Sequence, residues 1–302
     1  MKTATALVRA MRPGQWAKNL FVFAPVLFAH SWHKEGVLLR VIATFAIFCL
    51  LASSIYLLND VADAEADRLH PRKRLRPVAS GQLSAAVAVA AAVVFACSGL
   101  AWAYLGLGGR LVTLAGGIYL AIQLAYTYFL KRVVIVDVLC ISSGFVLRLI
   151  AGSDASFVPQ STWILVCTIF LSLFLALCKR RHEVVSLGDD AAAHRAILAD
   201  YPPAFLDQLI SAATACTLLS YTLYTVDSRT AVAHHLVRKG EPMPYLAATV
   251  PFVVFGVFRY LFLVYRRDGG GSPTSTLAKD VPMIVNGLLY ASAVAAVLHF
   301  GR

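Results

Sequence analysis

Apolar residues dominate nine stretches of this chain, most of them about 20 residues long and bounded by charged residues, proline or glycine. None of the stretches alternates between apolar and polar positions, so the pattern indicates helices and not strands. Runs of this length match the thickness of a bilayer, where only helices and closed barrels satisfy every backbone polar group. The pattern therefore predicts an all-α integral membrane protein, a bundle of nine transmembrane helices. The stretches are residues 19–32, 37–58, 83–104, 111–130, 133–152, 160–178, 208–227, 244–265 and 281–300, of which the first is short and contains Pro25.

Composition excludes most other classes of protein. Of the 302 residues, 59% are hydrophobic and 14% charged, against roughly 25% charged in soluble domains. A soluble enzyme, a disordered chain and a secreted disulfide scaffold are all excluded. The six cysteines stand singly in apolar runs, so neither disulfides nor zinc is expected. The first residues lack an apolar core and a small-residue cleavage site, so no cleavable signal peptide is expected. We expect one polytopic domain over residues 1–302.

The basic residues predict how the bundle is oriented. Of the 27 lysines and arginines, 18 lie in the N-terminal stretch and in residues 59–82, 131–132, 179–207 and 266–280. The opposite loops and the C-terminus hold seven. Because cytoplasmic loops are enriched in lysine and arginine, the N-terminus is predicted to be cytoplasmic. We expect a multi-pass protein of the cell (inner or plasma) membrane, with its longest loops facing the cytoplasm.

An acidic motif ends the second stretch. Asn59, Asp60, Asp63 and Asp67 fall within about 100° on one helix face if the helix continues through them. Three carboxylates and an amide on one face repel one another unless a cation lies between them, and hard oxygen ligands favour Mg²⁺. Mg²⁺ is commonly held together with substrate phosphates, so a phosphorylated substrate is implied. The alternative is a solvated acidic helix end.

Cations follow this motif directly. They are Arg68, Arg72, Lys73, Arg74 and Arg76. A carboxylate face next to closely spaced cations fits a metal–diphosphate better than either feature alone. Positive-inside anchoring is the alternative and explains part of the set.

These residues resemble the UbiA superfamily of intramembrane prenyltransferases. The resemblance lies in Asn-Asp-x-x-Asp-x-x-x-Asp followed by a basic loop, and extends over most of the chain. It includes Arg12-Pro13-x-Gln15-Trp16-x-Lys18-Asn19, Tyr126-x-x-x-Leu130-Lys131, Asp137-Val138 and Gly144-Phe145-Val146-Leu147-Arg148. It implies a nine-helix bundle with a cytoplasm-facing cavity, and Asp60, Asp63 and Asp67 as catalytic residues that hold Mg²⁺ with Asn59.

One difference from the superfamily pattern indicates which branch of the superfamily this chain resembles. Aromatic prenyltransferases of this superfamily carry a second aspartate-rich motif after the sixth span, where this chain has Lys179-Arg180-Arg181-His182-Glu183. Asp189 and Asp190 lack the paired spacing of that motif. The cationic pattern is similar to the decaprenyl-phosphate phosphoribosyltransferase branch. Its members transfer 5-phosphoribose from phosphoribosyl diphosphate (PRPP) to a polyprenyl phosphate with Mg²⁺, and their product resembles a precursor of cell-wall arabinan.

The number of cations at the predicted cytoplasmic helix ends favours this branch. Phosphoribosyl transfer must hold a diphosphate, a 5-phosphate and a lipid phosphate, so it needs more cations and fewer carboxylates than transfer to an aromatic acceptor. Each candidate also has an interpretation that involves no substrate, such as an interfacial anchor, an aromatic-belt tyrosine or a snorkelling lysine. The substrate-binding candidates are Gln15, Lys18, Asn19, Asn59, Arg72, Lys73, Arg74, Arg76, Tyr126, Lys131, Asp137, Lys179, Arg180 and Arg181.

Two other functions stay open at this point. An aromatic polyprenyltransferase of quinone synthesis would share the first acidic motif but needs the second one. A transporter would suit intramembrane charges and broken helices, although the polar residues gather at predicted cytoplasmic helix ends and no inverted repeat is present. No nucleic-acid partner is expected, and the sequence leaves both the lipid chain length and assembly into a homo-oligomer open.

Overall fold

The computed structural model describes residues 2–29, 31–69, 73–187, 196–234, 236–238, 240–266 and 279–300. This part of the chain is helical apart from one short hairpin, β1 (Val237–Arg238) and β2 (Glu241–Pro242), so the all-α prediction is confirmed. The chain separates into two compact units, residues 1–160 and 161–302. The expectation of a single domain stays a prediction.

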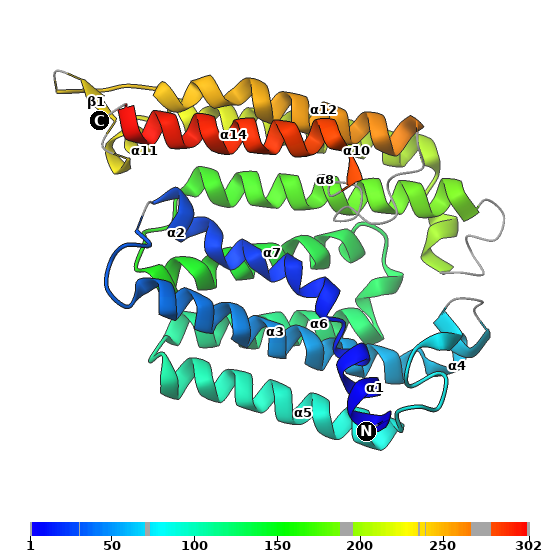
Figure 1. Cartoon of the computed structure of the whole chain (residues 1–302). Helices are drawn as coiled ribbons and strands as arrows, with labels where there is room; N and C mark the ends of the chain where they lie inside the picture. Colours follow the sequence, from blue (N-terminus) through cyan, green and yellow to red (C-terminus); the bar gives the residue numbers. More distant parts are fainter. Residues whose placement is uncertain are drawn as a thin grey trace. The chain divides into compact units, whose positions relative to one another are not determined.

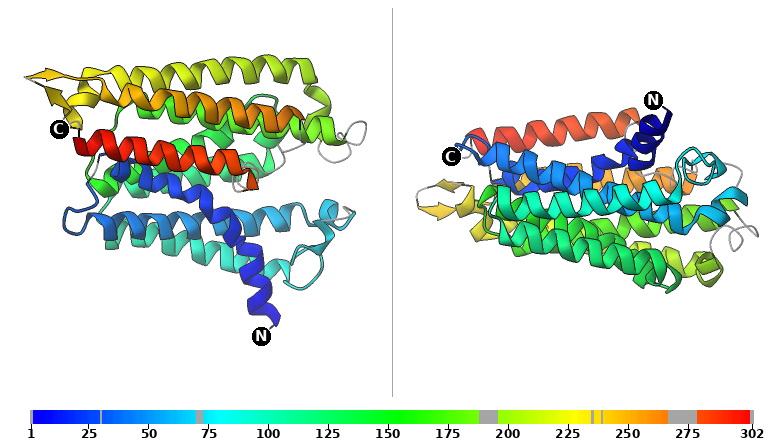
Figure 2. Two further views of the ribbon diagram at one scale, coloured as in Figure 1. Left: turned by 45° about the horizontal axis from the view of Figure 1, so that its top comes forward. Right: turned by 90° about the horizontal axis from the view of Figure 1, so that it is seen from below.

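The first unit is organised around one long central helix, α3 (Figure 1). Its most apolar window is 67% buried, because α1, η1, α5, α6 and α7 all pack against it. Figure 2 shows α1 crossing α3 at an angle, whereas α5 runs along it. The elements are α1 (Lys2–Met11), η1 (Pro13–Phe23), α2 (Ala24–Phe28), α3 (Val37–Ala62), α4 (Ala64–Leu69), η2 (Lys73–Leu75), α5 (Ala85–Ala101), η3 (Trp102–Gly106), α6 (Arg110–Tyr128), η4 (Leu130–Arg132) and α7 (Val136–Ser156).

The second unit consists of two packed helix pairs. Helix α8 packs along α10, and α12 packs against α14. Tyrosines of α10 and α14 meet at one end of the unit, where the Tyr221 hydroxyl contacts Thr249 at 2.7 Å and Tyr290 at 3.2 Å. The elements are α8 (Thr162–Leu187), η6 (Ala196–Asp200), α10 (Pro203–Val226), α11 (Ser228–Ala233), the hairpin, η7 (Tyr245–Thr249), α12 (Val250–Arg266) and α14 (Val281–Phe300).

Eight helices in the described part of the chain are long and apolar enough to cross a membrane. They correspond to the second to ninth predicted runs. The first predicted run, 19–32, is instead divided between the 3₁₀ helix η1 and the five-residue helix α2. Hydropathy does not distinguish an α-helix from a 3₁₀ helix, so the count of nine regular transmembrane helices is not confirmed.

Helix η1 lies unusually close to α7. A Cβ atom added to Gly152 would stand 2.1 Å from the carbonyl oxygen of Val22. Only glycine permits two backbones to approach to this distance. This contact fixes the position of η1, which carries several of the candidate residues.

Candidate active site

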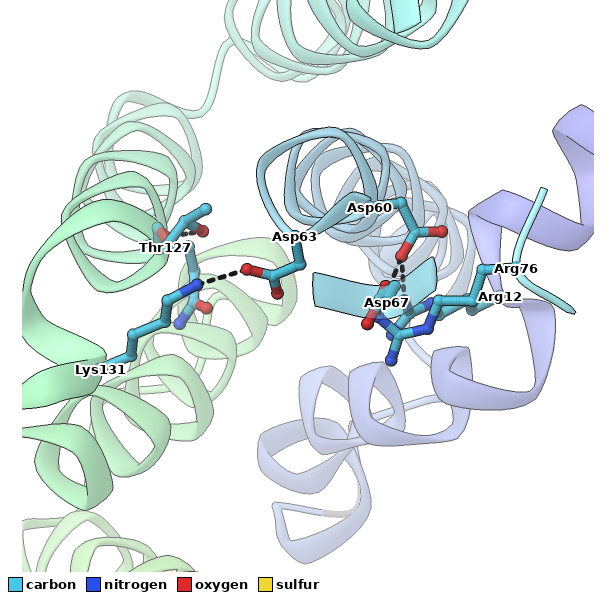
Figure 3. Close-up of polar contacts among 8 residues, drawn as sticks. Arg12, Asp60, Asp63, Asp67, Arg76, Thr127 and Lys131 are labelled. Carbon is cyan, nitrogen blue, oxygen red and sulfur yellow. Dashed lines mark hydrogen bonds and ion pairs between the residues drawn. The ribbon is translucent and has the colours of Figure 1, made fainter. Parts of the chain in front are cut away.

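Two aspartates and two arginines form a compact cluster in the first unit (Figure 3). One oxygen of Asp60, Oδ1, forms an ion pair with Arg12 Nη2 and lies 3.6 Å from Arg76 Nη1. The same Arg76 nitrogen lies 2.6 Å from Asp67 Oδ2. The Asp60 side chain is 1% exposed, so its charge depends on these guanidinium groups for compensation. Arg12, Asp60, Asp67 and Arg76 are called the aspartate–arginine cluster below.

A break in the helix separates Asp63 from this cluster. Helix α3 ends at Ala62, and Asp63 adopts φ −97° and ψ 5° before α4 begins at Ala64. Backbone hydrogen bonds from Asp63 to Asn59 (2.9 Å) and from Asp67 to Asp63 (2.8 Å) continue across the break. The expected continuous helix is therefore wrong at this one residue.

The Asp63 side chain points toward α6 and η4 instead (Figure 3). Its Oδ1 atom accepts a 2.7 Å hydrogen bond from Lys131 Nζ. Both side chains are partly exposed, at 37% for Asp63 and 21% for Lys131. Lys131 comes from η4, directly after α6, so this pair joins the two helix ends.

The predicted metal ligands are therefore not assembled as one group. Asp60 and Asp67 lie together, Asp63 faces Lys131, and no set of three or more His, Cys, Asp or Glu side chains in the described ranges is arranged to hold a metal ion. The Oδ2 atom of Asp60 is nevertheless buried without a hydrogen-bond partner. A buried carboxylate oxygen in that state is open to a cation, and Mg²⁺ prefers such hard oxygens. Asp60 and Asp67 thus fit one Mg²⁺, while the role of Asn59 and Asp63 as ligands stays a prediction.

Arg12 is a site residue that the sequence analysis did not select. Its backbone is left-handed, at φ 55° and ψ 63°, immediately before Pro13. This conformation is disfavoured for a non-glycine residue and even more so before proline. The guanidinium lies 5.1 Å from the centre of the Tyr56 ring and pairs with Asp60. The Arg12-Pro13 dipeptide was the signal in the sequence that could have pointed to Arg12. It does not identify Asp60 as the partner, because Asp60 lies 48 residues away in sequence.

Helix η1 forms a series of side-chain contacts along one face of α3. Trp16 Nε1 donates to Ser53 Oγ at 3.2 Å, and Asn19 Nδ2 donates to Cys49 Sγ at 3.2 Å. Three residues of a 3₁₀ helix and four residues of an α-helix both rise about 6 Å, so the two contacts fall in register. Arg12 and Asp60 extend this series at the end that holds the aspartate–arginine cluster.

Asn19 is committed to packing contacts. It is fully buried, and its Oδ1 atom accepts a 2.7 Å hydrogen bond from Arg148 Nε. Arg148 also donates to the Gly144 carbonyl at 2.6 Å and to the Tyr119 hydroxyl at 3.3 Å. Because these contacts use both polar atoms of the Asn19 amide, Asn19 positions η1, and its predicted role in substrate binding receives no support from this geometry.

The other candidates of the first unit lie in several environments. Gln15 and Arg74 are exposed, while Lys18, Lys73, Tyr126 and Asn59 are partly buried. Asp137 is fully buried at the start of α7. Arg72 lies outside the described residues, as do Asp189 and Asp190. The substrate-binding role predicted for these residues is not tested by their placement.

The three cations at the end of α8 pair with acids of the second unit. Arg180 is 1% exposed and donates to Glu183, which also lies 3.6 Å from Lys179. Arg181 Nε lies 2.5 Å from Asp207, and its guanidinium lies 3.7 Å from the centre of the Tyr265 ring. The Arg181 contacts join α8 to α10 and α12, whereas the Arg180–Glu183 pair lies within α8. The substrate-binding role predicted for Lys179, Arg180 and Arg181 stays a prediction.

The family of the chain follows from its similarity to known proteins. A model of the UbiA prenyltransferase family matches residues 20–277. The chain belongs to this family. It is 34% identical to the decaprenyl-phosphate phosphoribosyltransferase of Corynebacterium glutamicum, over 93% of this chain and 83% of that protein. It is 33% identical to the Mycobacterium tuberculosis protein of the same name, over 98% of this chain and 95% of that protein. The resemblance predicted from the sequence is confirmed.

Solved structures agree with this assignment at the level of the fold. A UbiA homolog from Archaeoglobus fulgidus bound to GPP and Mg²⁺ superposes with a TM-score of 0.69 over 97% of this chain and 99% of that one, at 18% identity. The family is one of transferases, so the chain is an enzyme and the transporter alternative is wrong. Its eight candidate spans fit a multi-pass membrane protein.

Proposed function

We propose that this UbiA-family enzyme transfers 5-phosphoribose from PRPP to a polyprenyl phosphate and releases diphosphate. The observation that carries the proposal is its similarity, over nearly the full length of both chains, to relatives named decaprenyl-phosphate phosphoribosyltransferase. A similarity to a 4-hydroxybenzoate octaprenyltransferase extends over only 53% of this chain. Transfer to a phosphate acceptor is therefore favoured over transfer to an aromatic acceptor.

The charged residues of the first unit suit a diphosphate leaving group. Arg12 and Arg76 lie beside Asp60, and Lys131 lies beside Asp63, so cations and carboxylates alternate over the junction between α3 and α4. Asp60 and Asp67 would hold Mg²⁺, and a homolog of the same fold that is bound to Mg²⁺ supports the choice of metal. When bound, Mg²⁺ would neutralise charge on the departing diphosphate. Arg76 and Lys131 would donate hydrogen bonds to phosphate oxygens.

The chemical step needs no strong base in the protein. An oxygen of the lipid phosphate forms a bond to the anomeric carbon of the ribose while the bond from that carbon to the diphosphate breaks. A single displacement inverts the configuration at this carbon. The lipid phosphate is largely ionised near pH 7, so the protein has to orient both anions and to stabilise the leaving group. We place this site at the cytoplasmic face of the plasma membrane, because PRPP is a soluble metabolite.

The test is turnover of radiolabelled PRPP by the purified protein in detergent, with Mg²⁺ and polyprenyl phosphates of several chain lengths. We expect label in the lipid fraction, and none after EDTA removes the metal. Absence of transfer by folded protein would refute the proposal. Prenyl diphosphate with aromatic acceptors, assayed in parallel, would then test the alternative function.

A further inference from the structure

The two oxygens of Asp60 have very different surroundings. Oδ1 is next to two guanidinium groups, those of Arg12 and Arg76, whereas Oδ2 is buried with no hydrogen-bond partner. Arg76 also contacts Asp67, so it keeps a carboxylate partner when Asp60 takes another ligand. Among the described residues, the Arg12 guanidinium forms an ion pair with Asp60 alone; Arg12 is 27% exposed, while Asp60 is 1% exposed. Arg12 can therefore move outward without leaving a second carboxylate uncompensated.

We propose that Arg12 is an exchangeable counter-ion of Asp60. Without ligand it neutralises this carboxylate, and when a metal–diphosphate binds, it releases Asp60 to the metal and donates to the diphosphate instead. The proposal rests on the proposed function and adds to it a residue that recognises the diphosphate group. It also predicts that Arg12 competes with a divalent cation that arrives alone.

The charges of the cluster agree with such an exchange. Two carboxylates and two guanidinium groups sum to zero. A divalent cation alone would leave the cluster with two uncompensated positive charges, and a diphosphate alone would be repelled by Asp60 and Asp67. A metal and a diphosphate that bind together avoid both penalties, because the guanidinium released from Asp60 meets the incoming anion.

The backbone at Arg12 is held in one conformation. Its left-handed conformation before Pro13 persists only where the surroundings enforce it. Hydrogen bonds from Arg12 N to the Arg9 carbonyl (3.2 Å) and from Gln15 N to the Arg12 carbonyl (2.8 Å) hold the turn. The Tyr56 ring, 5.1 Å from the guanidinium, offers a cation–π contact that does not depend on Asp60. The turn and the ring together keep the guanidinium close to the carboxylate after exchange.

The test separates metal binding from diphosphate binding by using Mg²⁺ alone and then inorganic diphosphate with Mg²⁺, both measured by calorimetry on the full chain. Arg12→Gly removes the side chain but keeps a residue that adopts the left-handed turn without strain. We expect this variant to bind Mg²⁺ alone about tenfold more tightly than the wild type, because no guanidinium hydrogen bond to Asp60 has to be broken. We expect it to bind Mg–diphosphate about tenfold more weakly, because one charge-assisted hydrogen bond is lost.

Two further variants control the experiment. Arg9→Ala removes a cation of α1 whose side chain donates an exposed 3.4 Å hydrogen bond to Gln82, and should change neither affinity. Arg12→Lys keeps the charge and should retain most of the competition with Mg²⁺. A merely structural role for Arg12 would weaken both affinities or leave both unchanged, and either result would overturn the proposal. Inorganic diphosphate lacks ribose and lipid. The two affinities therefore test the role of Arg12 even if phosphoribosyl transfer itself is not observed.

Discussion

Replacing Gly152 by alanine would place a methyl group against the backbone of η1. The new Cβ would stand 2.1 Å from the carbonyl oxygen of Val22 and 2.9 Å from its carbonyl carbon. Contacts under 3.0 Å are essentially never made by real Cβ atoms, so η1 must move by at least 0.9 Å, the difference between 3.0 and 2.1 Å. A backbone segment cannot rotate away as a side chain does. The clash can therefore be relieved only by moving packed backbone, which costs stability.

The movement would also affect the Asn19–Arg148 contact on the same helix. This hydrogen bond measures 2.7 Å, and a displacement of this size is enough to break it. Overpacking costs about 1–3 kcal/mol, and a hydrogen bond to a charged group contributes about 1.5–3 kcal/mol. We expect Gly152→Ala to lose about 3 kcal/mol or more, which lowers the unfolding midpoint of a 302-residue chain by about 5 °C or more.

The assay is thermal unfolding in detergent at a fixed scan rate, followed by tryptophan fluorescence, because Trp16 lies in η1 and contacts Ser53. Gly117→Ala is the matched control, since Gly117 lies in α6 with nothing within 4 Å of the added Cβ. It should be neutral or stabilising by up to about 1 kcal/mol. Equal midpoints for the two variants would refute the reasoning about the η1–α7 contact.

Three further predictions concern single residues of the first unit. Arg148→Lys should lose about 2 kcal/mol in the same unfolding assay, because an ammonium group cannot reproduce the three contacts of the guanidinium; an unchanged midpoint would contradict this. Ser84→Ala should lower stability by about 1 kcal/mol, because Ser84 Oγ accepts a 3.3 Å hydrogen bond from the N–H of Val87, the third residue of α5; the free energy of urea unfolding measures it. Asp63→Ala should reduce transfer from labelled PRPP by about 100-fold, while Glu65→Ala, on an exposed neighbour, should not. Full Mg-dependent turnover by folded Asp63→Ala would exclude Asp63 from the site.

The fold was largely predictable because hydropathy carries most of the information about membrane helices. The eight long helices coincide with eight apolar runs, since bilayer thickness sets their length and lipid requires apolar side chains. The first run is not confirmed as a regular transmembrane helix, because the 3₁₀ helix η1 packs against α3 and α7 and hydropathy does not report such packing. Gly152 permits that packing from more than a hundred residues away, and no local pattern reports it.

The site was predictable in its chemistry but not in its pairing. The acidic motif and the nearby cations could be found in the sequence, yet the direction of Asp63 depends on a one-residue break and on Lys131, 68 residues further along. Arg12 was missed for the same reason, because its partner Asp60 lies 48 residues away in sequence. The pairing of Arg180 with Glu183 was readable from the i,i+3 spacing, whereas that of Arg181 with Asp207 was not.

The register between η1 and α3 restricts how the N-terminal segment can vary in length. One residue inserted between Trp16 and Asn19 would rotate the preceding chain by about 120°, and both Trp16 and Arg12 would then face away from α3. Three inserted residues would restore the facing but advance the segment by about 6 Å, which would bring Arg12 past Asp60. Insertions and deletions in proteins built on this plan are therefore expected before Arg12 or after α2, and an affinity tag belongs ahead of α1.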